Sequence, residues 1–172
     1  MKYLVISDTH GDISKASEIA EKYKNELKGI IHLGDMIKDA VNLKYRFKDL
    51  EVEYICGNND YNSTVPYEKM LVIGGKKILL THGHRQRVNY GLMSISYWAL
   101  EKGADAVFFG HTHTPTCQYI DGLAIFNPGS ISYPRGVDFV SYGMLEVTEN
   151  GRLIISLFKC NEDGTEEKIA MM

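Results

Sequence analysis

Seven side chains with oxygen or nitrogen donors stand in short polar clusters along the first two thirds of the chain. They are Asp8, His10, Asp35, Asn58, His82, His111 and His113. Carboxylate, imidazole and amide donors without cysteine favour a catalytic site for Mn, Fe, Ni, Zn or Co over a structural thiolate zinc site. One metal ion rarely takes seven such donors, whereas two ions that share a bridging carboxylate would use them. The set therefore predicts a centre of two divalent metal ions.

The elements that would position these donors are short apolar strands. Strands are predicted over residues 2–6, 29–33, 51–56, 77–80 and 104–109, and each is followed by a polar cluster. In open α/β sheets, ligands bind beyond the carboxyl ends of the strands. The clusters are therefore expected to meet at one edge, with Gly34, Gly57, Gly83 and Gly110 allowing sharp turns and close approach of the backbone.

The order of the predicted elements changes halfway along the chain. Helices are predicted over residues 13–27 and about 38–48, so the first half alternates strand and helix, which favours βαβ units with parallel strands. In the second half, a helix is predicted over about residues 88–103, and hairpin signals stand at residues 74–75, 121–122 and 150–151. Together they predict a mixed α/β fold with two sheets packed face to face and helices outside. No boundary is visible, so one domain over residues 1–172 is expected.

Bulk composition limits the classes of protein to which the chain can belong. Its 172 residues are 44% apolar and 24% charged, which is typical of a globular protein. The formal charge of −3 gives no strong signal for nucleic-acid binding, because general nucleic-acid binders are usually basic. Three widely spaced cysteines suit a reducing compartment, and no window approaches the length of a membrane span. A cytoplasmic protein with no membrane partner is expected.

The polar clusters, taken in order, resemble the motif series of the calcineurin-like metallophosphoesterases. The residues that carry the resemblance are Asp8-x-His10, Gly34-Asp35, Gly57-Asn58-Asn59-Asp60, His82-Gly83-His84 and Gly110-His111-x-His113. Their spacing and the later Asn127-Pro128-Gly129-Ser130 are similar to those of the small prokaryotic phosphodiesterase branch. The resemblance implies a four-layer α/β/β/α sandwich with two mixed β-sheets.

The same resemblance implies a role for each donor. Asp8, His10 and His113 would hold one metal ion, Asn58, His82 and His111 would hold the other, and Asp35 would bridge both. Manganese is the first expectation, with nickel, iron, zinc and cobalt as alternatives. Two such ions activate a bridging hydroxide for in-line attack on phosphorus. The implied function is that of a metal-dependent phosphodiesterase that acts on a small phosphodiester.

One motif position departs from the wider superfamily. Many members carry histidine after the motif asparagine, where it is thought to protonate the leaving group, whereas this chain has Asn59. A carboxamide cannot act as a general acid near neutral pH. Either the leaving group needs little protonation, or His84, His10 or a metal-bound water supplies the proton. Asn59 is also expected to contact the substrate, as are Arg85 and Arg135, whose guanidinium groups suit bidentate contacts with phosphate.

Several other residues have a structural interpretation. His32 lies inside a predicted strand and is expected in the core or behind the ligands. Asp39 is expected on a solvated helix face, and Asp60 is expected to cap or orient its loop. Tyr61 and Tyr133 are candidates for lining a pocket for a base or an aryl group, although the eleven tyrosines of the chain make this signal weak.

Two other functions fit the same sequence. A protein of this fold, such as the retromer subunit, can serve mainly as an interaction scaffold with little or no catalysis, because a fold does not fix a function. Seven competent donors favour catalysis over this alternative. A phosphomonoesterase or a nuclease is a further alternative, although nothing in the chain resembles an added domain for such substrates. Homo-oligomerisation stays open.

Overall fold

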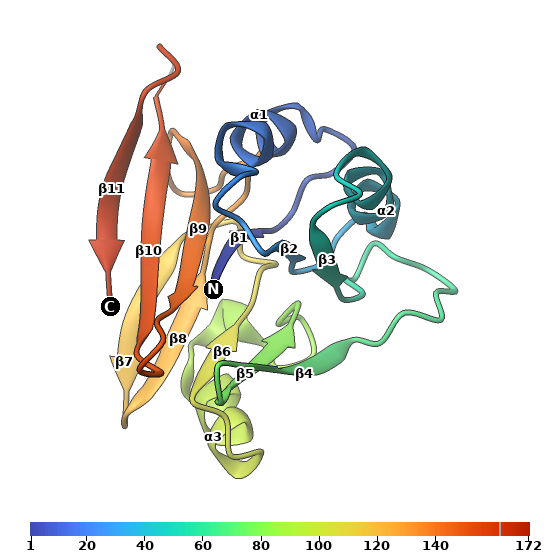
Figure 1. Ribbon diagram of the computed structural model, residues 1–172. Helices are drawn as coiled ribbons and strands as arrows, with labels where there is room; N and C mark the ends of the chain where they lie inside the picture. Colours follow the sequence, from blue (N-terminus) through green and yellow to red (C-terminus); the bar gives the residue numbers. More distant parts are fainter. Residues whose placement is uncertain (162) are drawn as a thin grey trace.

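The computed structural model describes residues 1–161 and 163–172, whose strands form two sheets (Figure 1). The first sheet has the strand order β11-β10-β9-β1-β2-β3. Its strands are β1 (Lys2–Ile6), β2 (Gly29–His32), β3 (Glu51–Tyr54), β9 (Val140–Val147), β10 (Leu153–Cys160) and β11 (Glu166–Met171). β1, β2 and β3 pair in parallel, and β9, β10 and β11 extend the sheet as antiparallel strands. The parallel pairing predicted for the first half of the chain is confirmed.

The second sheet has the strand order β4-β5-β6-β8-β7. Its strands are β4 (Glu68–Ile73), β5 (Lys76–Thr81), β6 (Ala106–Phe108), β7 (Thr116–Ile120) and β8 (Leu123–Asn127). Hairpins join β4 to β5 and β7 to β8, while β6 pairs in parallel with both β5 and β8. The third predicted hairpin joins β9 to β10 in the first sheet. Both sheets are therefore mixed, as the sequence predicts.

Alternation of side chains along the strands explains why the sheets stack and why helices cover their outer faces. In β1, Val5 packs between the sheets, whereas Leu4 packs with residues of α1 (Ser14–Tyr23) and α2 (Ile37–Arg46). In β6, Phe108 belongs to the core between the sheets, and Val107 packs with α3 (Met93–Glu101). Figure 1 shows α1 and α2 beside β1–β3, and α3 beside β5 and β6. The layers follow the order α/β/β/α, which confirms the predicted architecture.

Two features of the fold differ from the sequence expectation. The helix predicted from residue 88 is interrupted, because Val88–Tyr90 forms a short 3-10 turn, η1, and α3 begins only at Met93. Gly91 separates them with a φ of 123° and a ψ of 174°, which is not a helical conformation. Strand β11 has no counterpart in the prediction, and its sequence, EEKIAM, opens on three charged residues without an apolar run.

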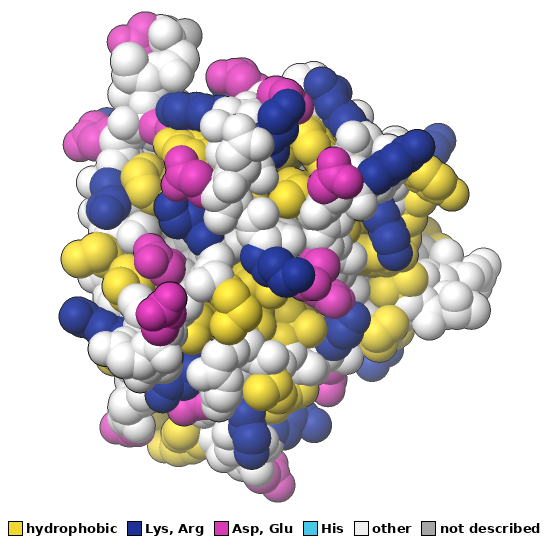
Figure 2. All heavy atoms as spheres, in the orientation of Figure 1, with side chains coloured by type: hydrophobic (Ala, Val, Ile, Leu, Met, Phe, Trp, Pro, Cys, Tyr) yellow, Lys and Arg dark blue, Asp and Glu magenta, His cyan; other side chains and the backbone are white. Residues whose placement is uncertain are grey.

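The surface carries charges of both signs. On the face shown in Figure 2, acidic and basic side chains are interspersed among apolar ones, and no extended basic area is visible. A surface of this kind gives no long-range field of a single sign on that face. None of the described helices is long and apolar enough to cross a membrane.

Candidate metal centre

The seven predicted donors lie in loops that follow strands of both sheets. The donors are Asp8 and His10 after β1, Asp35 after β2, Asn58 after β3, His82 after β5, and His111 and His113 after β6. Backbone hydrogen bonds join these loops. Asp8 N donates to the Gly34 carbonyl at 3.3 Å, and Gly110 N donates to the His82 carbonyl at 3.1 Å. Between the sheets, His82 Nδ1 lies 2.8 Å from the Leu33 carbonyl, and His111 N donates to Asp8 Oδ2 at 3.1 Å, so the donor loops of both sheets meet at one edge of the sandwich.

One group of donors consists of Asp8, His10 and His113. Their ligand atoms lie within 4.8 Å of one another. The Nε2 atoms of His10 and His113 are 3.1 Å apart, and His113 Nε2 is 3.3 Å from Asp8 Oδ1. Asp8 and His113 are buried, whereas His10 is partly exposed. The structure thus brings together the three residues that the resemblance gives to one metal ion.

A second group forms around Asp35 and His82. These two residues and Asp8 have ligand atoms within 4.8 Å of one another. His82 Nε2 lies 3.3 Å from Asp35 Oδ1 and 3.0 Å from Asn58 Oδ1. On the other side, Asp35 Oδ2 lies 3.8 Å from His10 Nε2. The Asp35 carboxylate therefore has one oxygen facing each group, which suits a bridging ligand.

Two of the imidazole rings turn a lone pair toward the carboxylates. His82 Nδ1 lies 2.8 Å from the Leu33 carbonyl, and His113 Nδ1 lies 2.5 Å from the Tyr133 carbonyl. A carbonyl only accepts, so each Nδ1 carries the proton, and Nε2 of the neutral ring has none. Asp8 Oδ1 is buried beside them and has no hydrogen-bond partner among the described residues. Acceptor atoms that are crowded together without donors fit divalent cations.

The electrostatics of the centre also favour added positive charge. Burial alone would raise the pKa of the Asp8 carboxyl, but contacts with His113 and His82 outweigh burial and hold that pKa below its ordinary value. The pKa of Asp35 is lowered in the same way, by His82 and Asn59 against the effect of burial. For His82, burial is outweighed by Asp35 and Asp8, and the pKa of the ring is raised. The two ionised carboxylates thus attract a proton to His82, and a metal cation would neutralise the same negative charge.

The backbone bends sharply at the donors themselves. Five of the seven have positive φ angles, from 45° to 67°, and they are Asp8, His10, Asp35, His111 and His113. Each non-glycine residue in this region costs on the order of 1–3 kcal/mol, and such residues cluster at functional sites. Gly57 and Gly110 are needed for close approach. A Cβ at Gly57 would overlap the Asp35 carboxylate, and one at Gly110 would lie 2.7 Å from Asp8 Oδ2.

The end of β8 and the segment after it support two of the donor loops. Ser130 Oγ donates to the Asp8 carbonyl at 2.8 Å, and Ser132 Oγ donates to the same carbonyl at 3.0 Å. Asn127 Nδ2 donates to the Gly110 carbonyl at 2.9 Å. These bonds fix the backbone of two donor loops. The sequence gives no direct sign of the bonds to Asp8, because they join residues more than a hundred positions apart.

His111 lies beside the two groups but belongs to neither of them. Its ring centroid is 5.2 Å from that of His82, and its backbone N donates to Asp8 Oδ2 at 3.1 Å. Its Nε2 atom is 3.0 Å from Asn89 Nδ2. Asn89 was not predicted as a site residue, because it lies in η1 and no motif in the sequence marks it.

Asn59, His84 and Arg85, which were predicted to protonate the leaving group or to contact the substrate, each contact a different residue of the chain. Asn59 turns toward Asp35, to whose two oxygens its backbone N and its Nδ2 donate at 3.0 and 2.6 Å. The ring of His84 packs 5.5 Å from that of His82, and burial, followed by the charge of His82, lowers the pKa of His84 to about 4. Arg85 lies over the ring of Tyr67, at 3.6 Å from its centroid.

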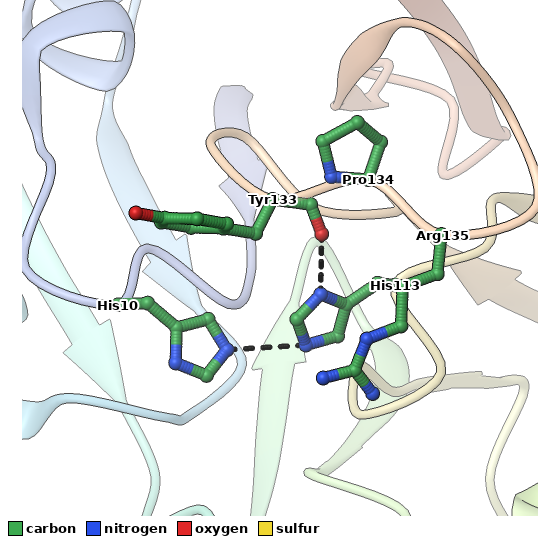
Figure 3. A pocket seen from close by; sticks show the side chains of 5 residues that line it. All are labelled: His10, His113, Tyr133, Pro134 and Arg135. Carbon is green, nitrogen blue, oxygen red and sulfur yellow. Dashed lines mark hydrogen bonds between the residues drawn. The ribbon is translucent and has the colours of Figure 1, made fainter.

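Arg135 lines an open pocket next to the first donor group (Figure 3). The other lining residues are His10, His113, Tyr133 and Pro134, and the volume is about 380 Å³. Tyr61, the other tyrosine that the sequence suggested for a pocket, is 82% exposed and does not line this one.

The expectation for Asp39 was wrong. Its side chain is buried, and its Oδ2 accepts hydrogen bonds from Thr9 Oγ1 at 2.6 Å and from Gly11 N at 2.8 Å. His32, which is fully buried as expected, also contacts Thr9 Oγ1, at 3.0 Å. Asp39 thus holds the first donor loop and does not face solvent. Asp60 orients its own loop, as expected, by accepting from Gly57 N at 2.9 Å. It also accepts from two backbone N–H groups at the start of α2, which was not expected.

Comparisons with known proteins show the family and the fold of the chain. The family model described as calcineurin-like phosphoesterase superfamily domain matches residues 1–150. YsnB of Bacillus subtilis, a probable metallophosphoesterase, is 34% identical over 155 residues, which cover 90% of this chain and 89% of the relative. The phosphodiesterase YfcE of Escherichia coli K12 is 28% identical over 169 residues, which cover 85% and 88% of the two chains. The solved structure of Vps29 from Entamoeba histolytica, complexed with zinc, has the same fold, with a TM-score of 0.82 at 23% identity over 100% of this chain and 98% of that one.

Proposed function

Because the chain belongs to the calcineurin-like phosphoesterase superfamily, we propose that it hydrolyses small phosphodiesters at a centre of two divalent metal ions. The observation that carries the proposal is the crowding of acceptor atoms around Asp8 Oδ1, which is buried and has no hydrogen-bond partner among the described residues. The nearby Nε2 atoms of His82 and His113, at 3.8 and 3.3 Å, add lone pairs to the same space. The name of the relative YfcE supports a diester over a monoester.

The proposed ligands are the two donor groups extended by Asn58 and His111, which lie beside His82. Asp8, His10 and His113 hold one ion, Asn58, His82 and His111 hold the other, and Asp35 lies between them. Oxygen and imidazole donors suit manganese, which we propose first, and they also suit nickel, iron, zinc and cobalt. The chemistry that two bound ions supply is neutralisation of the phosphoryl oxygens and a lowered pKa for the attacking water. The chain contributes carboxylates that stay ionised at neutral pH and rings whose tautomers are fixed by backbone carbonyls.

Neither Asn59 nor His84 is suited to protonate the leaving group. Asn59 has no titratable proton, and its amide is already bonded to Asp35. His84, with its pKa lowered to about 4, is neutral near pH 7 and cannot deliver a proton efficiently. We therefore give His84 a hydrogen-bonding role and propose that the preferred esters have good leaving groups. Arg85 and Arg135 remain the proposed contacts for the phosphate oxygens.

Metal analysis combined with a turnover assay tests this function. The purified chain is loaded with Mn²⁺, its metal content is measured, and hydrolysis of bis(4-nitrophenyl) phosphate is followed. We expect about two ions per chain and a turnover that falls at least roughly a hundredfold in His111→Ala. Tyr45→Ala, which changes an exposed residue of α2, is the control and should keep both values. Less than about one ion per chain after loading, or unchanged turnover in His111→Ala, would contradict the proposal.

An interaction scaffold of the same fold is the alternative function. It is favoured by the exposed apolar side chains Tyr90, Met93 and Tyr97, which lie in and beside α3. A folded chain that binds Mn²⁺ but hydrolyses no ester would support the scaffold. Hydrolysis of 4-nitrophenyl phosphate faster than of the diester would support a phosphomonoesterase, and cleavage of polynucleotides alone would support a nuclease.

A further inference from the structure

The pocket beside His10 adjoins the proposed metal ligands, and two of its lining residues, Tyr133 and Pro134, have no part in the chemistry described so far (Figure 3). Its volume of about 380 Å³ lies in the range of small-molecule sites. We propose that this pocket binds a planar aromatic group, such as a nucleobase, on one ester arm of the substrate. Nucleoside phosphodiesters are then the preferred substrate class. This inference rests on the proposed function, because the phosphate must sit at the metal centre for the arm to reach the pocket.

The pocket shares a wall with the metal centre. His10 and His113 line the pocket and also belong to the donor group around Asp8. The ring of Tyr133 stands perpendicular to that of His10, with 6.0 Å between the two centroids. An ester arm only a few bonds long therefore reaches Tyr133 from a phosphate held at these histidines.

Tyr133 supplies the aromatic surface of the pocket. Its side chain is 60% exposed, and Pro134 adjoins it in the lining. Stacking of a base on an aromatic side chain strengthens binding roughly tenfold or more, and it accepts any base because every base has a flat face. A tyrosine and a proline next to a phosphate site therefore fit a nucleoside better than a small aliphatic alcohol.

Arg135 supplies the charge of the pocket. Its backbone is engaged, since Arg135 N donates to the His113 carbonyl at 3.4 Å and Thr114 Oγ1 donates to the Arg135 carbonyl at 2.9 Å. Its guanidinium lies on the pocket side of His113 and has no ion-pair partner among the described residues. A guanidinium of this kind donates two parallel hydrogen bonds to two oxygens of a phosphate.

Hydrogen bonds of the Tyr133 backbone also hold the pocket in place relative to the proposed metal ligands. The Tyr133 carbonyl accepts from His113 Nδ1, and Tyr133 N donates to Ser130 Oγ at 2.7 Å. Ser130 in turn bonds the Asp8 carbonyl. The segment that carries Tyr133 and Arg135 is therefore fixed to two of the proposed ligands, and a pre-ordered site of this kind loses little freedom on binding.

The opposite side of the centre is less suited to an aromatic arm. Arg85 lies over the ring of Tyr67 at 3.6 Å, so one face of that ring is already covered. The edge of the His84 ring adjoins the same tyrosine, with 5.8 Å between centroids. The aromatic surface near Arg85 is thus occupied by the chain itself, whereas that of Tyr133 is open.

Two esters with the same leaving group test the substrate class. Thymidine 5′-(4-nitrophenyl phosphate) and methyl 4-nitrophenyl phosphate differ only in the second arm, so the ratio of their kcat/KM values reports on the pocket. We expect a ratio of roughly ten or more in the manganese-loaded protein, and a roughly tenfold smaller ratio in Tyr133→Ala. Tyr133→Phe, which keeps the ring, and Tyr45→Ala, a matched exposed tyrosine on α2, should keep the ratio.

Binding measured by calorimetry gives a second readout that needs no turnover. Thymidine 5′-phosphate is titrated into the manganese-loaded protein, with methyl phosphate as the comparison. Tyr133→Ala is expected to lower the affinity for thymidine 5′-phosphate roughly tenfold and to leave the affinity for methyl phosphate unchanged. Equal kcat/KM for the two esters, or a ratio that survives in Tyr133→Ala, overturns the inference. If neither ester is hydrolysed, the proposed function fails, and an unchanged affinity for thymidine 5′-phosphate in Tyr133→Ala then overturns the inference separately.

Discussion

The floor and the rim of the candidate centre are built differently. The floor consists of Asp8, Asp35 and His82, whose side chains are at most 3% exposed. The rim residues Asn58 and His111 are partly exposed. Floor donors are held by buried bonds, such as the 2.5 Å contact from Ser7 Oγ to Asp8 Oδ2 and the Leu33 carbonyl behind His82. Among the rim donors, Asn58 Oδ1 contacts His82 Nε2, and His111 Nε2 contacts the side-chain amide of Asn89.

This difference indicates where the centre is pre-ordered. Buried like charges and positive φ angles oppose folding, so the floor can persist only because the surrounding bonds over-determine it. The rim has fewer such bonds and can adjust to a bound ion or ester. We therefore expect substitutions in the floor to abolish metal binding and those in the rim to alter rate or selectivity.

The largest effect is expected when one floor ligand is compared with one rim ligand. Asp35→Asn removes the charge between the two groups while keeping the shape, and we expect kcat/KM for an aryl diester to fall by about 10³-fold or more, with loss of at least one ion per chain. Asn58→Ala should cost only about 10- to 100-fold, because a neutral rim donor can be replaced by water. Metal analysis and steady-state kinetics measure both. Equal losses in the two variants would break the distinction between floor and rim.

A leaving-group series tests whether the rim supplies a proton. With no general acid of suitable pKa at Asn59 or His84, kcat/KM should fall at least about a hundredfold from 4-nitrophenyl to phenyl esters of the same phosphate. His84→Gln should leave this dependence equally steep, whatever it does to the rate. A shallow dependence in the wild type that becomes steep in His84→Gln would show that His84 does act as the acid.

The floor donors could be predicted from the sequence, whereas the residues that hold or contact the donors could not. The donors Asp8, Asp35 and His82 follow apolar strands, so local periodicity placed them at strand ends, and the resemblance grouped them. Asp39 and Asn89 were misjudged or missed, because their roles depend on partners far away in the chain, such as Thr9 for Asp39. No local pattern reports such a contact, and the charged edge strand β11 was missed for a related reason, since pairing with β10 defines it.

Close packing around the floor is tested by comparing two glycines. Gly110→Ala would press a Cβ against Ser7 and the Asp8 carboxylate, so we expect a loss of about 1–3 kcal/mol in the free energy of unfolding and weaker Mn²⁺ binding. Gly122→Ala, in the turn between β7 and β8, is the matched control. It has a positive φ of 82° but no neighbour within 4 Å, so it should cost only about 1 kcal/mol and leave Mn²⁺ binding intact. Denaturant unfolding and metal titration separate the two outcomes. Normal Mn²⁺ affinity in a folded Gly110→Ala protein would contradict the packing argument.

The smallest expected effect is on the pH dependence of thermal stability, because a proton and a metal ion compete for His82. The folded-state pKa of His82 is raised above its ordinary value of 6.5, so its contribution to stability is complete below about pH 6.5 and is lost as the pH rises through the folded-state pKa. The lowered pKa values of Asp8 and Asp35 act at the other end, where stability is lost as the pH falls below about 4. The metal-free protein should therefore melt at a lower temperature at about pH 8.5 than at about pH 6. Because Mn²⁺ takes the place of that proton, the ion should raise Tm more at the higher pH. Thermal melts with and without Mn²⁺ at the two pH values measure this, with His82→Asn as the variant in which the pH dependence of the metal-free protein should shrink. An increase in Tm from Mn²⁺ that is the same at both pH values would mean that proton and metal do not compete at the floor.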